Sequence, residues 1–138
     1  MFMLNDSSPS ISWSVLDHKR VPKLAYQAIT EACQPVIVTS DRLPETVAPG
    51  DCLALDVHVV NDLRVALESA TLTAHLRWPN GEHEWTFSGS AAGDDCTRIG
   101  TLQFVVPDAP GELWLDLTLD AEHVATTNRD QTYIVPKV

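Results

Sequence analysis

Residues 71–87, TLTAHLRWPNGEHEWTF, decide the fold class. In the first half of this stretch apolar residues occupy every second position from Leu72 to Trp78, and polar residues stand between them. This period of two is typical of a half-buried antiparallel strand. The tripeptide Pro79-Asn80-Gly81 follows, and Asn-Gly tolerates the positive φ angles of a tight turn. The stretch therefore predicts a β-hairpin that returns through residues 83–87.

The same alternation recurs along the chain after Pro35. The predicted strands cover residues 36–38, 53–60, 71–78, 83–87, 102–106, 113–119 and 132–135. Clusters of Pro, Gly, Asn and Asp separate them, and such residues favour turns. Residues 89–93, Gly-Ser-Ala-Ala-Gly, are expected to form a flexible loop. Seven short strands over about 100 residues are typical of an immunoglobulin-like sandwich. We therefore expect a mainly β protein, an immunoglobulin-like antiparallel β-sandwich of about seven strands preceded by one α-helix.

The expected helix lies before the strands. Its apolar residues fall at helical spacing: Leu24, Ala25, Ala28, Ile29 and Ala32. Pro22 suits the first helical turn, where its missing N–H costs nothing, and Pro35 ends the helix. A segment that includes the expected helix thus precedes an all-β region. The predicted boundary separates residues 1–34 from residues 35–138.

Composition and charge exclude several classes of protein. A hydrophobic content of 44% with 20% charged residues is ordinary for a globular protein and argues against disorder. The net charge of −10 argues against nucleic-acid and anionic-membrane partners. No apolar run reaches the roughly 18 residues of a membrane span. The only basic cluster, Lys19, Arg20 and Lys23, is expected to pair with acidic neighbours.

Three cysteines, Cys33, Cys52 and Cys96, are an odd number at wide spacing. They fit neither a zinc site nor a disulfide framework, so we interpret them as reduced, mostly buried small hydrophobic residues. A single disulfide between two of them is the alternative in an oxidising compartment. Reduced thiols favour a cytoplasmic location. No signal peptide is visible in this sequence, and the alternative is one in a missing upstream part.

The sequence offers no catalytic or metal site. His58 and His75 lie on the polar phase of their strands and could face one another across a sheet, but no third ligand accompanies them. Asp94-Asp95 is interpreted as a polar turn, because a hard cation needs more oxygen ligands. Neither a Gly-x-Ser-x-Gly motif nor a phosphate-binding glycine loop is present. We therefore expect no catalytic residue, no metal and no cofactor in this chain.

Tryptophans are the candidates for ligand binding in the β region. Trp78, Trp85 and Trp114 could form an aromatic platform for a sugar. Trp114 stands out of phase with the leucines around it, which places it on the outer face of its strand. Packing of these side chains against a neighbouring domain is the alternative.

The opening segment carries a motif. Leu4-Asn5-Asp6, Pro9, the run Ser12-Trp13-Ser14-Val15-Leu16-Asp17, Arg20, Pro22-Lys23 and Ala25-Tyr26 occur in this order. The pattern resembles a stretch of glycoside hydrolase family 2, in its β-mannosidase-like branch. In that family the motif ends the catalytic (β/α)8 barrel and an immunoglobulin-like sandwich follows. The resemblance covers about the first 40 residues by motif. This chain departs from it at Ser8, where the family usually has Trp, which implies a different subsite or substrate if that Trp walls the sugar pocket.

The resemblance implies that residues 1–34 are the remnant of the last barrel strand, loop and helix. The chain would then be a non-catalytic accessory domain, since the family's two catalytic carboxylates come from earlier strands. Its partner would be the catalytic barrel, in the same chain or in trans, and an uncovered helix would favour a homodimer. Asn5, Asp6 and Trp13 would lie near the sugar; alternatively Trp13 packs at the barrel–sandwich interface and Asn5-Asp6 only form a turn. Two rival hypotheses are a carbohydrate-binding module and a self-standing interaction domain.

Overall fold

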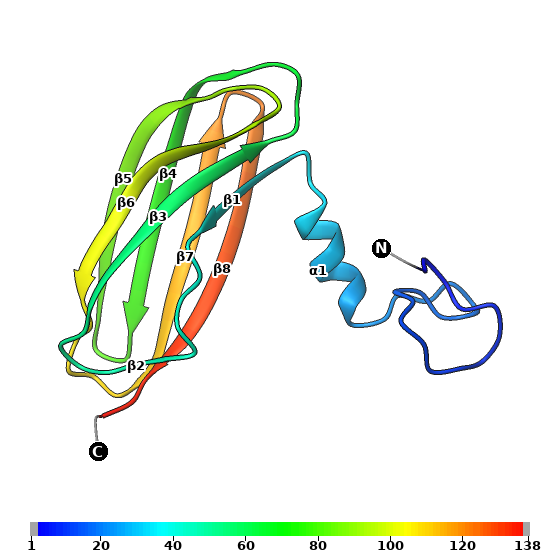
Figure 1. Cartoon of the computed structure of the whole chain (residues 1–138), viewed down its shortest axis with the longest axis horizontal. Helices are drawn as coiled ribbons and strands as arrows, with labels where there is room; N and C mark the ends of the chain where they lie inside the picture. Colours follow the sequence, from blue (N-terminus) through cyan, green and yellow to red (C-terminus); the bar gives the residue numbers. More distant parts are fainter. Residues whose placement is uncertain (1–2, 137–138) are drawn as a thin grey trace. The chain divides into compact units, whose positions relative to one another are not determined.

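The computed structural model describes residues 3–136 and divides the chain into two compact units, one up to Gln34 and one from Pro35 onward (Figure 1). The second unit contains all eight strands found in the described residues, and the first contains the helix α1 (Ala25–Ala32). Residues 3–136 are therefore mainly β with one short helix, which confirms the predicted fold class.

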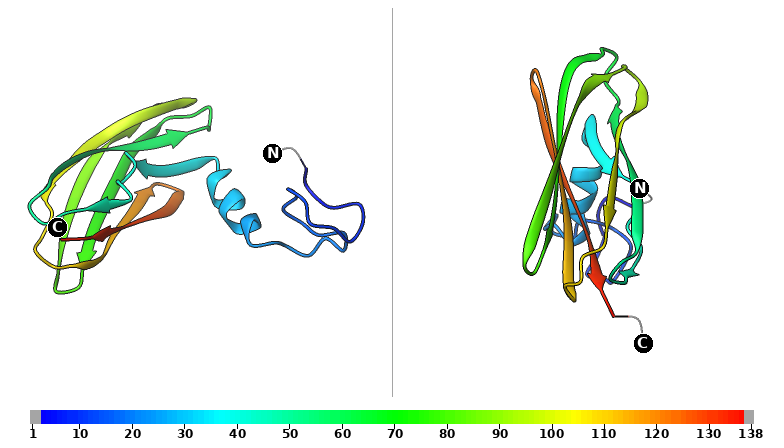
Figure 2. Two further views of the ribbon diagram at one scale, coloured as in Figure 1. Left: turned by 60° about the horizontal axis from the view of Figure 1, so that its bottom comes forward. Right: turned by 90° about the vertical axis from the view of Figure 1, so that its left-hand side faces the viewer.

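Two sheets face each other in the second unit, and Figure 2 shows them as separate layers. The strands are β1 (Val36–Ser40), β2 (Thr46–Val47), β3 (Cys52–Asn61), β4 (Leu67–Trp78), β5 (Gly81–Ala91), β6 (Asp95–Val105), β7 (Gly111–Ala121) and β8 (Val124–Ile134). The smaller sheet has the order β1-β3-β6 and the larger has the order β2-β8-β7-β4-β5. Neighbouring strands are antiparallel except for β2 and β8, which run parallel. The predicted antiparallel sandwich is thus corrected at one edge, by a two-residue strand that is too short to show a period.

The alternating residues of the sequence form the core between the sheets. Leu72 and Leu76 of β4 lie opposite Leu119 and Leu115 of β7 in register, and all four are buried. The smaller sheet contributes Leu55, Val57 and Val59 of β3, Leu102 of β6 and Val38 of β1. Burying one such side chain stabilises the fold by roughly 1.5–3 kcal/mol.

The predicted loop at residues 89–93 is wrong for its first part. Strand β5 continues to Ala91, which pairs with Leu67 and is fully buried. Gly89 and Ser90 are exposed strand residues and Ala91 packs into the core, so the small residues of this stretch did not indicate flexibility. The turn comes later, where Asp94 adopts a φ of +51° and its N–H donates to the carbonyl of Leu63.

The prediction of mostly buried cysteines is also wrong. Cys33, Cys52 and Cys96 are all free and exposed. Cys52 and Cys96 stand near opposite ends of the β3–β6 pair, opposite Val105 and Val60 respectively. Cys52 shares the outward phase of β3 with Asp56 and His58, and Cys96 of β6 lies opposite Val60 of the same phase, which explains why the core covers neither cysteine.

The helix α1 begins three residues later than predicted, at Ala25 instead of Pro22. Pro22 instead forms an antiparallel bridge with Leu16, and the N–H of Lys23 donates to the carbonyl of Val15. This pairing holds the chain extended where the sequence indicated a first helical turn. None of the residues of α1 is buried.

No helix within residues 3–136 has the length and apolar character that a bilayer span requires.

Candidate functional site

The segment of residues 4–23 folds as three short strand-like stretches with Leu16 in the middle. Leu16 forms a parallel bridge with Asn5 and an antiparallel bridge with Pro22. Its N–H donates to the carbonyl of Leu4 at 2.9 Å, and its carbonyl accepts from the N–H of Asp6 at 3.1 Å. The motif residues near Asp6 and those near Lys23 are thereby brought side by side.

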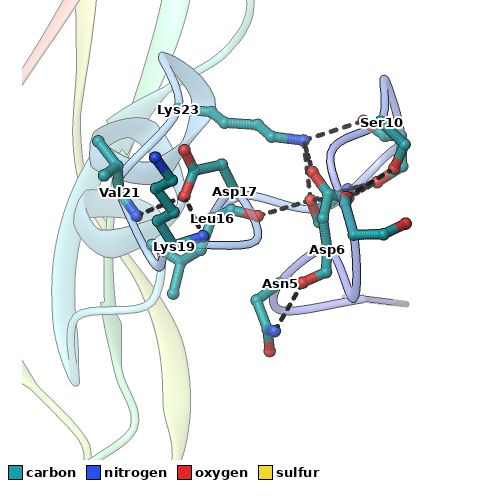
Figure 3. Close-up of polar contacts among 11 residues, drawn as sticks. Asn5, Asp6, Ser10, Leu16, Asp17, Lys19, Val21 and Lys23 are labelled. Atoms are coloured by element: carbon teal, nitrogen blue, oxygen red, sulfur yellow. Dashed lines mark hydrogen bonds and ion pairs between the residues drawn. The ribbon is translucent and has the colours of Figure 1, made fainter.

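Asp6 is the buried charge of this unit, with a side chain only 1% exposed. The Nζ of Lys23 lies 2.8 Å from its Oδ2, the hydroxyl of Ser14 lies 2.7 Å from its Oδ1, and the hydroxyl of Ser12 donates to the same oxygen (Figure 3). The hydrogen bonds from Lys23, Ser12 and Ser14 lower the pKa of Asp6 from 3.8 to about 2. The carboxylate is therefore ionised and fully paired inside the unit. We call Asp6, Ser12, Ser14 and Lys23 the Asp6 network.

Ser14 and Lys23 are close enough to be compared with a nucleophile and its base. The Nζ of Lys23 lies 2.8 Å from the Oγ of Ser14 and donates to it. A serine nucleophile must instead give its proton to the base and be reachable by a substrate. The Oγ of Ser14 donates to Asp6 or to the carbonyl of Leu16, and the residue is only 4% exposed. The Asp6 network is therefore suited to fixing the segment and not to catalysis.

A second carboxylate closes the turn between the paired stretches. The Oδ1 of Asp17 accepts the N–H groups of Val21 at 2.8 Å and Lys19 at 2.7 Å (Figure 3). The hydrogen bond from Val21 contributes most to lowering the pKa of Asp17. Of the predicted basic cluster, Lys23 pairs with an acidic neighbour as expected, whereas Lys19 and Arg20 form no ion pair with another described residue.

The three residues proposed to lie near sugar do not share one environment. Asp6 is buried in its network, whereas Asn5 is exposed and its side-chain amide donates to the carbonyl of Asp6 at 3.0 Å. Trp13 is 85% exposed, although Ser12 and Ser14 on either side of it contact Asp6. Sequence reasoning missed Ser12, Ser14 and Lys23 as the partners of Asp6, because nothing local links these positions.

The N-terminal unit buries the carboxylate of Asp6 and the side chain of Val15 but exposes several large apolar side chains. Ile11 and Leu24 are as exposed as in an extended chain, and Trp13, Leu4 and Val21 are more than half exposed. These five residues are called the exposed apolar set below. Where exposed apolar side chains form one patch on a soluble protein, they mark an interaction site.

The three tryptophans of the sandwich do not form one platform. Trp78 of β4 and Trp85 of β5 lie on the core-facing phase of the larger sheet and pack, partly buried, against the core. Trp114 lies on the opposite face, in register with Arg77, as its phase in the sequence predicted. Trp85 contacts His83 edge-on, with ring centroids 4.2 Å apart. Trp85 and Trp114 are therefore separated by the sheet, and only Trp78 can join either of them.

Two depressions lie beside these tryptophans, one next to Trp85 and one next to Trp114. One of about 300 Å³ lies where the edge strands β5 and β6 approach, and its lining includes Trp78, His83, Trp85, Gln103, Phe104 and Pro107. The other, of about 260 Å³, lies on the outer face of the larger sheet. It is lined by Arg77, Trp78, Pro79, Glu112 and Trp114, and we call it the Trp114 depression.

Charged groups surround the Trp114 depression. The Nε1 of Trp114 donates to Glu112 at 3.1 Å, and the guanidinium of Arg129 lies over the indole, 5.4 Å from its centroid. Asp116 accepts from the Nε of Arg77 at 3.0 Å and from the Nε of Arg129 at 2.5 Å. Burial alone would raise the pKa of Asp116, but the hydrogen bonds from Arg129 and Arg77 outweigh it and hold that pKa below its ordinary value.

The histidines do not form a metal site in the described residues. His58 is in β3 of the smaller sheet and His75 in β4 of the larger one, so they do not face each other across a sheet. His75 instead contacts the carboxylate of Glu82 at 2.9 Å. Within residues 3–136, no group of three or more His, Cys, Asp or Glu side chains is placed to hold a metal ion.

Comparisons with known proteins give a fold and no family. No family model matches the chain, and no curated protein matches it in sequence. The sporulation control protein Spo0M from Bacillus subtilis aligns over 73% of this chain and 49% of its own, at 16% identity and a TM-score of 0.52. This chain thus spans about half of that protein.

A CARDB domain from Pyrococcus furiosus, solved in complex with di-metal ions, aligns over 74% of this chain and 92% of its own at 15% identity and a TM-score of 0.55. AvmM, which catalyses macrocyclization in alchivemycin A biosynthesis, aligns over 75% of this chain at 6% identity and a TM-score of 0.51. At such identities these likenesses show the β-sandwich architecture alone.

Proposed function

We propose that this chain is a non-catalytic C-terminal accessory domain of a family 2 glycoside hydrolase that acts on β-linked sugars, of the β-mannosidase-like kind. In this proposal the N-terminal unit docks on the catalytic barrel and the sandwich follows it. The order of motif residues from Leu4 to Tyr26 supports the proposal, and so does the immunoglobulin-like sandwich that comes after them. The observation that carries it is the exposed apolar set on a segment held by a buried ion pair.

The motif residues explain why such a segment keeps one shape. Asp6, the Ser12–Ser14 pair and Lys23 come from three separate parts of the motif, and together they form the Asp6 network. A fixed loop presents Trp13 at a lower entropy cost than a mobile one would, because the backbone is ordered before binding. The network therefore serves to hold the exposed apolar set in place for a partner surface.

The partner in this proposal is the barrel, because the motif implies it and the exposed apolar set offers apolar surface for it to cover. Covering a large apolar side chain such as Trp13, Ile11 or Leu24 contributes roughly 1.5–3 kcal/mol. Catalysis belongs to the barrel in this account, since retaining glycosidases need two carboxyl groups about 5 Å apart on barrel strands. The chain contributes stability to the enzyme and no reacting group.

The test compares this chain with the product of its coding region extended upstream. Both are assayed with aryl β-mannoside, β-galactoside and β-glucuronide substrates. Trp13→Ala is made in the extended product, with Val65→Ala as the control, because Val65 is also an exposed apolar residue but belongs to the sandwich. We expect activity in the extended product alone, and a lower Tm and activity for Trp13→Ala than for Val65→Ala. Activity in the short chain, no glycosidase activity in the extended product, or equal behaviour of the two variants would overturn the proposal.

A further inference from the structure

The Trp114 depression has walls that other residues hold in place. Trp114 is fixed by the hydrogen bond from its Nε1 to Glu112 and by the guanidinium of Arg129 over its ring. Arg129 does not line the depression, so it braces the indole without filling the space. An outward-facing tryptophan on a sheet is thus given one orientation.

Gly81 and Gly111 lie beside two other lining residues of the Trp114 depression, Trp78 and Pro79 respectively. A Cβ on Gly81 would lie 2.7 Å from the indole of Trp78, so only glycine lets that ring lie against the β4–β5 turn. Gly111 has a φ of +138°, and a Cβ there would lie 2.9 Å from the Cγ of Pro79. The aromatic and proline surfaces therefore reach the depression because the backbone beside them carries no side chain.

Charge around the depression is balanced. Arg77 and Arg129 carry two positive charges, while Glu112 and Asp116 carry two negative ones. A balanced site does not attract an ion of either sign, and the net charge of −10 disfavours an anionic ligand further. The ligand chemistry that fits is neutral and polar.

Two lining residues of the Trp114 depression, Arg77 and Glu112, retain groups that can form further hydrogen bonds. The bonds to Asp116 use the Nε and Nη2 of Arg77, and the bond from Trp114 uses the Oε2 of Glu112. The Nη1 donor of Arg77 and the Oε1 acceptor of Glu112 have no hydrogen-bond partner among residues 3–136. A vicinal pair of hydroxyl groups can both accept and donate, and therefore matches this pair of groups.

We infer that the Trp114 depression is a binding subsite for one neutral hexopyranoside ring. The apolar C–H face of the sugar packs on the indole of Trp114, and its hydroxyl groups bond to Arg77 and Glu112. A volume of about 260 Å³ lies below the roughly 300–1,000 Å³ of pockets for drug-sized ligands, which suits a single ring. The subsite lies in the sandwich and does not depend on docking of the N-terminal unit. The tryptophan that binds is Trp114, with Trp78 as a side wall, and Trp85 takes no part.

The test is an NMR titration of the four indole N–H signals of the chain with β-1,4-mannotriose, cellotriose and, as a competitor class, a proline-rich peptide. The Trp114 signal is assigned by its loss in Trp114→Phe. We expect saturable shifts of Trp114 and Trp78 with at least one trisaccharide, at a dissociation constant on the order of 1 mM for so small a ligand. The Trp13 and Trp85 signals should stay in place.

Variants separate binding from folding. Trp114→Ala should weaken sugar binding by about tenfold or more, and Glu112→Gln by a smaller factor, because its amide oxygen can still accept from Trp114. Thr118→Ala, on the same face of β7, is the matched control and should bind like the unaltered chain. If Trp114→Ala does not fold, Trp114→Phe still tests the site, since it keeps a ring and loses the bond to Glu112. No saturable shift up to about 50 mM of either sugar, shifts confined to Trp85, or a response to the peptide alone would overturn the inference.

Discussion

The ammonium group of Lys23 lies 2.8 Å from the Oδ2 of Asp6, and this ion pair joins the first and last stretches of the folded N-terminal segment. The backbone of Lys23 is bound in the same place, since its N–H donates to the carbonyl of Val15 at 2.9 Å. The carboxylate of Asp6 and the backbone pairing therefore both hold the segment that presents Trp13.

Removing that carboxylate should loosen the N-terminal unit and leave the sandwich intact. In Asp6→Asn the ammonium of Lys23 loses its counter-charge, and the buried site keeps fewer acceptors. We expect the amides of Asp6 and Leu16 to exchange about tenfold faster or more, measured by hydrogen exchange with NMR. Asp17→Asn is the control, because an asparagine oxygen can still accept from Val21 and Lys19. Equal exchange in the two variants would contradict the role given to Asp6.

The same pair predicts a pH dependence. The pKa of Asp6 is about 2 in the folded unit against an ordinary value of 3.8, so the unfolded segment takes up its proton first as the pH falls. The stabilisation is complete above about pH 4 and is lost as the pH falls from 3.8 towards 2. Titration of the Asp6 carboxyl carbon by NMR should give a midpoint near 2. A midpoint at the ordinary value would show that the network does not form in solution.

Core and surface leucines should respond differently to truncation. Leu115→Ala removes a fully buried side chain from β7 and should lower the free energy of unfolding of the sandwich by about 2–5 kcal/mol. Leu24→Ala alters a fully exposed residue, and its effect on the isolated chain should stay within about 0.5 kcal/mol. Denaturation in urea, followed by tryptophan fluorescence and circular dichroism, measures both. A large loss for Leu24→Ala would mean that its side chain is covered within this chain.

Substitution by alanine should have different effects at two glycines in the edge strands β5 and β6 of the two sheets. A Cβ on Gly100 would lie 2.4 Å from the ring of Phe87, whereas a Cβ on Gly89 meets only the end of Ile99 at 3.6 Å. Gly100→Ala should therefore destabilise the sandwich by about 1–3 kcal/mol through overpacking. Gly89→Ala should be close to neutral, and equal Tm values for the two variants would contradict the packing described for Phe87.

The sequence predicted the parts of the fold that alternation controls. Leu72 to Leu76 and Leu113 to Leu119 alternate without interruption, because both strands bury one face against the opposite sheet. Strand β8 was predicted only from Thr132 onward, since its earlier part is polar; Asn128 there bonds to the carbonyl of Val38 and Thr132 to that of Pro44. Such strand ends are specified by hydrogen bonds between distant residues, which periodicity does not record.

The candidate sites were also predictable only in part, because they too depend on contacts between residues that are distant in the sequence. The phase of Trp114 placed it on the outer face, but its partners Arg77 and Glu112 follow from strand register. Asp6 was singled out by the motif, whereas its burial depends on Ser12, Ser14 and Lys23 folding back onto it. Contacts between separate stretches of chain decide both sites.

Hydrogen exchange of the segment that contains Ile11 and Trp13 measures whether a barrel covers the exposed apolar set. It is measured in this chain and in the product extended upstream, under the same conditions. Docking on a catalytic barrel predicts that the amides of residues 10–14 exchange at least about tenfold more slowly in the extended product, while those of β4 and β7 do not change. Equal exchange of residues 10–14 in the two products would show that the exposed apolar set is not covered and that this unit does not dock on a barrel.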